Sequence, residues 1–178
     1  MKTYLTYGSA MAGGGFVLTL VLYILGFHSD PAKLSAAQWL QGGLGLVISI
    51  ACIVLGTKAR RATVPATEEF GYGSALGAGV MIGLVAAVIG LLTTYLYIGV
   101  INPHFNELIL QAQADKMEAQ GLSAEKVEQI QKMSAPFMKL PMQLAFSFIG
   151  GMFFATLVSL VTAAFLKRPA SDELQSVT

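Results

Sequence analysis

The sequence predicts an all-α membrane protein in which four transmembrane helices form two parallel helical-hairpin repeats, with an extramembrane amphipathic αα-hairpin between spans three and four. Composition is the first reason: 54% of the 178 residues are hydrophobic and 12% are charged, whereas soluble domains carry about 25% charged residues. The second reason is that the charges are segregated. Four stretches contain no Asp, Glu, Lys or Arg, and each exceeds the roughly 20 residues that cross a hydrocarbon core: 3–27, 34–57, 70–102 and 140–166.

The first span is expected to be a retained helix rather than a signal peptide. Lys2 is the only basic residue before it, and LGFHSDPAK after it is a poor cleavage site. The apolar run also exceeds the roughly 7–15 residues of a signal peptide's hydrophobic region.

Basic residues predict the orientation of the spans. Lys and Arg in short loops concentrate on the cytoplasmic side of a membrane. Basic residues precede the first span and follow the second and fourth, and all three arginines are among them: Lys2, Lys58, Arg60, Arg61, Lys167 and Arg168. Both termini are therefore expected in the cytoplasm.

Similar sequences open and close the two halves of the chain. The letters YGSA begin at Tyr7 and again at Tyr72, each at the start of a span. KARRATVPATEE follows the second span and KRPASDE follows the fourth. This pattern predicts a duplicated helical hairpin, unlike the inverted repeats of many transporters. The alternative is convergence, since small residues at span starts and basic residues at cytoplasmic ends are common.

The expected organisation is a first two-helix repeat (1–62), a cytoplasmic linker (63–71), a second repeat (72–168) with the insert 102–139, and a cytoplasmic tail (169–178).

Small residues at every fourth position predict close helix packing. In lipid, helices associate through van der Waals contact, which small side chains permit at short range. Such contacts are expected within one chain, or alternatively at a seam between copies of the chain or with a membrane-protein partner. The residues concerned are Gly13 in the first span, Ala75, Gly79, Gly83 and Ala87 in the third, and Gly151, Ala155, Ser159 and Ala163 in the fourth.

The insert 102–139 is predicted to form two amphipathic helices outside the membrane. Asn102 and Pro103 suit the N-cap and first position of a helix, Gly121 suits its end, and Ser123 suits the next N-cap. The hairpin is expected either to stand off the membrane or to lie on it. Its apolar residues form the candidate partner surface: Phe105, Leu108, Ile109, Val127, Ile130 and Phe137.

Ionisable residues are missing from the cores of all four spans. Such residues mark proton relays and ion pathways in membrane proteins, so a proton-coupled transporter is not expected. Cys52 is the only cysteine, and the sequence contains no Walker loop, HExxH or GxSxG motif. We therefore expect no enzymatic activity, no cofactor and no nucleic-acid partner.

One group of residues suggests a metal site. His28 and His104 both follow a span on the predicted outer side, and His104 shares a helix face with Glu107. Imidazole and carboxylate are ordinary ligands of Zn²⁺. The alternative is that these histidines cap helices at the membrane surface.

Two stretches carry a resemblance to a known family. EEFGYGSALGAGVMIGLV at the third span, and the segment from DKMEAQGLSAEKVEQ to the basic end of the fourth span, resemble an uncharacterised bacterial membrane-protein family known only as a domain of unknown function. The resemblance implies a four-span protein of the bacterial inner membrane. It implies no activity, cofactor or functional residue.

Three functions remain open from the sequence. The first is a non-enzymatic accessory component that acts through a periplasmic hairpin. The second is a small transporter or pore, built by oligomerisation, for a neutral or lipid-like solute. The third is a metal-dependent or lipid-modifying enzyme at the outer face.

Overall fold

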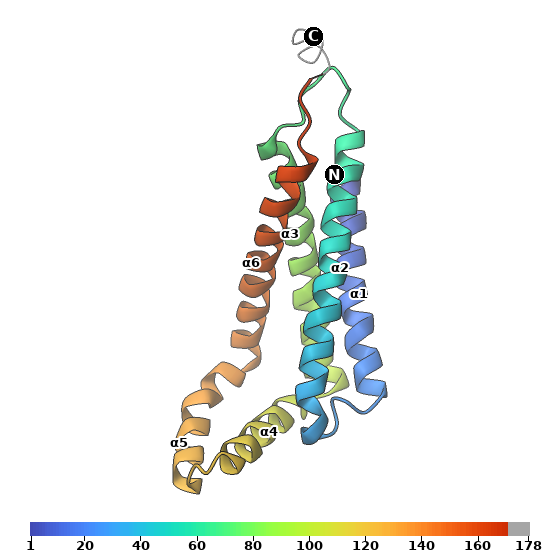
Figure 1. Ribbon diagram of the computed structural model, residues 1–178. Coiled ribbons are helices and arrows are strands. Elements are labelled where there is room, and N and C mark those ends of the chain that lie inside the picture. The colour runs from blue at the N-terminus through green and yellow to red at the C-terminus, as the bar shows by residue number, and fades with distance from the viewer. Residues whose placement is uncertain (171–178) are drawn as a thin grey trace.

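The computed structural model describes residues 1–170 and is helical, with four long helices side by side (Figure 1). Of the predicted tail 169–178, residues 171–178 lie outside the described part. The elements, in chain order, are α1 (Lys2–Ile24), a 3₁₀ turn (Pro31–Lys33), α2 (Leu34–Ala62), α3 (Tyr72–Leu96), a π-helical turn (Tyr97–Ile101), α4 (Phe105–Ala119), α5 (Ala124–Ser134), a 3₁₀ turn (Ala135–Met138) and α6 (Leu140–Leu166).

Within residues 1–170, four helical segments are long and apolar enough to cross a membrane, as the charge-free stretches predict: Lys2–Ile24, Pro31–Ala62, Tyr72–Ile101 and Leu140–Leu166. Their alternating directions give the bundle two ends. At the arginine end, α1 and α3 begin and α2 and α6 end. At the hairpin end, α4 and α5 extend beyond the long helices (Figure 1).

Helix α3 is the most extensively packed of the four long helices, and it contacts α1, α2 and α6. The tightest contacts lie in the arginine half. A Cβ atom added at Gly83 would overlap the side chain of Ala155, and one at Gly79 would overlap that of Ser159. Hydrogen in place of a side chain thus allows α3 and α6 to touch there. The fully buried Ile53 and Ile82 complete this core.

Arg168 joins the loop after α2 to the end of α6. Its backbone forms an antiparallel pair with Phe70, with N···O distances of 2.9 and 2.8 Å. Its guanidinium donates to the backbone carbonyl oxygens of Val64, Pro65 and Glu68 at 3.0, 2.7 and 3.4 Å. These bonds satisfy carbonyls of the 63–71 linker, which otherwise has little regular structure to do so.

The insert forms two helices as predicted, but the prediction for the start of the first is wrong. α4 begins at Phe105, after His104, and Asn102 is not its N-cap. The Asn102 side-chain amide instead donates to the backbone oxygen of His28 at 3.2 Å and to the Tyr97 hydroxyl at 3.3 Å. Contacts with the bundle therefore outweigh local capping here. Gly121, with a φ of +85°, ends α4 as predicted.

Candidate binding cavity

A cavity of about 950 Å³ lies between α1, α2, α3 and α6 in the hairpin half of the bundle. This volume is at the upper end of the roughly 300–1,000 Å³ typical of ligand pockets. At the hairpin end it is bounded by His28, Tyr97, Phe105 and Ile109. At the other end, Gly83 and Val158 mark the point where the arginine-half core begins.

Small residues create this cavity by leaving space where larger side chains would meet. A Cβ atom added at Gly15, Gly42, Gly45 or Gly90 would meet no atom within 4 Å, although all four glycines line the cavity. These four glycines therefore differ from Gly79 and Gly83, which permit contact between α3 and α6.

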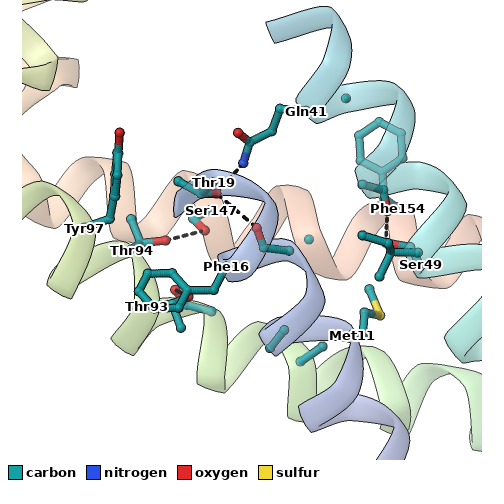
Figure 2. A pocket seen from close by; sticks show the side chains of 18 of the residues that line it. Met11, Phe16, Thr19, Gln41, Ser49, Thr93, Thr94, Tyr97, Ser147 and Phe154 are labelled. Atoms are coloured by element: carbon teal, nitrogen blue, oxygen red, sulfur yellow. Dashed lines mark hydrogen bonds between the residues drawn. The ribbon is translucent and has the colours of Figure 1, made fainter. Parts of the chain in front are cut away.

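The polar residues of the cavity gather toward its hairpin end. The Gln41 amide donates to the Thr19 hydroxyl at 2.6 Å, and that hydroxyl donates to the Gly15 carbonyl at 3.0 Å. The hydroxyls of Thr94 in α3 and Ser147 in α6 lie 3.5 Å apart at the wall of the cavity, which is a long hydrogen bond (Figure 2). We call Thr19, Gln41, Thr94 and Ser147 the polar tier.

The lining toward the arginine half is apolar. Met11 and Phe154 lie apart from the polar tier (Figure 2), and Ile48 and Val158 belong to the same region. Ser49 is the polar residue among them, and its hydroxyl donates to the Gly45 carbonyl of its own helix at 2.8 Å. The cavity is therefore amphipathic along its length.

An aromatic cluster closes the hairpin end of the cavity. The buried His28 Nδ1 lies 2.5 Å from the hydroxyl of Tyr97, which is also buried. The Phe105 ring of α4 lies 4.9 Å from the His28 ring and 5.4 Å from the Tyr97 ring, centre to centre. Burial lowers the pKa of His28 from its ordinary value, so the imidazole is neutral at pH 7. Tyr97 lies in the π-helical turn that links α3 to the hairpin.

A known family matches nearly the whole chain. The model of the family described as "Protein of unknown function (DUF4199)" matches residues 6–168, which include all four long helices and the cavity. The chain belongs to this family. No curated protein and no protein of solved structure matches it. Membership in the DUF4199 family carries no activity or ligand, so the site must be interpreted from its geometry.

The proposed metal ligands have separate environments. His28 is buried against Tyr97, whereas the exposed His104 pairs with Glu107 at 3.0 Å. In residues 1–170, no group of three His, Cys, Asp or Glu side chains could hold a metal ion. The geometry therefore gives the predicted zinc site no support.

The small-residue rows of α3 and α6 approach most closely in the arginine half and are in looser contact beside the cavity. Gly79 and Gly83 lie against Ser159 and Ala155, and Ala75 and Ala163 share a buried cluster. A Cβ atom at Gly151 would lie 4.0 Å from that of Ala87, and both residues line the cavity. Gly13, in contrast, has no atom within 4 Å of the position of a Cβ.

Much of the predicted partner surface faces the protein itself. Phe105 and Ile109 line the cavity, and Val127 is buried. Leu108 and Ile130 are half-buried. Phe137 is 51% exposed, and its ring lies 6.2 Å from that of Phe146.

The sequence gives weak signals for the polar tier. Gln38, Gln41 and Gln143 lie near span starts, where they are expected either to sit at the membrane interface or to bridge helices. Gln41 bonds to Thr19 and Gln143 bonds to Asn106, whereas the exposed Gln38 lines the cavity. Thr19, Thr94 and Ser147 were missed. Their common signal is a neutral polar residue in the hairpin-side part of each span, which becomes visible only when all four helices are compared.

Proposed function

We propose that the protein is a non-enzymatic membrane component that binds a lipid-like molecule in the cavity between its helices. The observation that carries the proposal is an amphipathic cavity of about 950 Å³ inside a bundle of four candidate spans. Hydroxyl, amide and apolar groups line it, and the imidazole in its lining, that of His28, is hydrogen-bonded to the hydroxyl of Tyr97. Such a lining suits binding of an apolar or amphipathic molecule better than proton transfer.

The packed arginine half favours binding over conduction. Ile53, Ile82, Ala155 and Ser159 are buried directly beyond the cavity. A pore would need a path through this core. The second function left open by the sequence, transport through an oligomer, would therefore need a route other than this cavity.

The proposal places the protein in the bacterial inner membrane, with the arginine end in the cytoplasm and the hairpin in the periplasm. It is supported by the three arginines, Arg60, Arg61 and Arg168, which all lie at one end of the bundle, and by the rule that Arg and Lys favour the cytoplasm. We further propose that α1–α2 and α3–α6 are duplicated hairpins. The two helices of each pair are in contact, and the letters YGSA occur near the start of α1, from Tyr7, and at the start of α3, from Tyr72.

The test is native mass spectrometry of protein extracted gently from its own membrane. We expect a small molecule that stays bound to the protein after detergent is removed. Gly90→Phe should remove it, because the new Cβ atom would meet no atom within 4 Å and the ring would occupy the cavity. Gly150→Phe is the matched control, since Gly150 is equally unobstructed but does not line the cavity.

Two outcomes would contradict the proposal. One is wild-type protein that carries no small molecule, and the other is equal retention in the two variants. A defined complex with another protein and an empty cavity would favour the accessory function instead.

A further inference from the structure

The cavity lining lacks a group that could neutralise a charged ligand. Of the described residues that line it, none is Asp, Glu, Lys or Arg. Lys33, which precedes α2, pairs with Asp30 at 3.7 Å and is not part of the lining. The lining imidazole, His28, is hydrogen-bonded to Tyr97 and neutral at pH 7. A buried phosphate or carboxylate would therefore lose its hydration without gaining a partner of opposite charge.

The polar tier offers hydrogen bonds suited to an uncharged head group. Gln41 uses one amide hydrogen on Thr19, and its carbonyl oxygen points away from that bond (Figure 2). The long contact between Thr94 and Ser147 leaves both hydroxyls free to bond more strongly to a ligand. Donors and acceptors together match hydroxyl and ester groups.

The exposed part of the lining shows where a ligand gains access. The lining residues of α1 and α3 are all buried or half-buried. The exposed lining residues come from the other two helices: Gln38, Gly42 and Leu46 of α2, and Ser147 and Phe154 of α6. We call this set the lateral opening. The ribbons of α2 and α6 also diverge toward the hairpin end (Figure 1). In a membrane, this opening faces the side of the bundle and thus the lipid.

We infer that the cavity takes an uncharged lipid, with a hydroxyl- or ester-bearing head group, sideways from the leaflet at the hairpin end. The inference rests on the proposed function and adds the head-group class and the route. The head group bonds to the polar tier, and the chain runs toward Met11 and Val158, which pack against the core of the arginine half. This is the orientation that a lipid of that leaflet already has, so the lipid binds without turning over.

The test compares two lipids with identical acyl chains, diacylglycerol and phosphatidic acid, by native mass spectrometry of delipidated full-length protein. We expect at least tenfold higher occupancy by diacylglycerol. Gln41→Leu should reduce that preference severalfold, and the double variant Thr94→Val, Ser147→Ala should do the same if Gln41→Leu does not fold. Ser49→Ala is the matched control, because this hydroxyl lines the cavity but is bonded to its own helix.

The outcomes separate the two claims. Equal binding of the two lipids, or a preference unchanged by the polar-tier variants, overturns the inference and leaves lipid binding standing. Binding of neither lipid overturns the inference, and a native extract that also lacks any small molecule overturns the proposed function.

Discussion

The two halves of the bundle use small residues to opposite effect. In the arginine half, Gly79 and Gly83 of α3 bring the helix against α6 so closely that no Cβ would fit. In the hairpin half, Gly90 of the same helix faces space with no atom within 4 Å. One type of residue on one helix thus forms a seam at one end and a cavity wall at the other.

This difference shows that helix contact depends on where both partners lie. α6 meets α3 at Ala155 and Ser159, and it leaves the bundle toward α5 at Pro141 and the turn Ala135–Met138. Proline cannot continue a helix into the preceding turn. The turn before α6 therefore sets the direction in which the first turns of α6 run. The space between these turns and α2 is the lateral opening.

The largest expected loss of stability follows from substitution of Gly83, at the contact of α3 with α6. Gly83→Leu should lower the free energy of unfolding by about 3 kcal/mol or more, because overpacking at a helix contact forces backbones apart. Gly90→Leu should have a much smaller effect, since the cavity accepts the side chain. Thermal unfolding in detergent measures both. Equal destabilisation by the two variants would contradict the distinction between seam and cavity.

The next largest loss of stability is expected from Arg168, whose guanidinium holds the 63–71 linker; we call these hydrogen bonds the Arg168 clamp. Arg168→Ala removes the hydrogen bonds to Val64, Pro65 and Glu68, and should cost about 1.5 kcal/mol, as for bonds made by a charged group. Limited proteolysis should then cut within 63–71. Lys167→Ala, at the exposed neighbouring residue, is the control. Cleavage that is no faster in Arg168→Ala than in the control would show that the clamp does not hold this loop.

The hairpin end should respond to the loss of a single hydroxyl. Tyr97→Phe leaves the buried His28 ring without its partner, and should cost about 1 kcal/mol. Faster amide hydrogen exchange in α4, with little change in the arginine half, would place that cost at the cavity's closed end. An effect spread evenly over the bundle would contradict the independence of the two halves.

The smallest expected effect is on pH dependence. Burial lowers the pKa of His28 below its ordinary value of about 6.5, so the opened hairpin end takes up a proton more readily than the closed one. The free energy of opening of this end should be highest above pH 6.5 and should decrease as the pH falls below that value. Hydrogen exchange of α4 at pH 7.5 and 5.5, corrected for intrinsic rates, measures the change.

His28→Gln should remove this pH dependence, while His104→Gln at the exposed imidazole should keep it. A pH dependence that persists in His28→Gln would assign the effect to another group.

The spans and their contacts are predictable from sequence because charge and residue size act locally. A segment such as 70–102 must avoid water along its whole length, and it forms the candidate span Tyr72–Ile101. The cavity is less predictable because Gly79 and Gly90 look alike in the sequence. Their different roles follow from what lies against each of them, Ser159 at Gly79 and the cavity at Gly90, and this depends on residues far away in the sequence. Asn102 shows the same limit, since its local signal for capping is overridden by His28 and Tyr97.

The most direct test of a closed arginine half and a lipid-accessible hairpin half uses two aromatic residues of α1. Phe16 lines the cavity, whereas Tyr7 packs against the core that contains Ile53 and Ile82. Both are half-buried. A photoreactive benzophenone side chain replaces each residue in turn, and the products of irradiation in native membranes are weighed. We expect lipid adducts at position 16 and cross-links within the protein at position 7. Lipid adducts that are equal at the two positions, or absent at position 16, would contradict it.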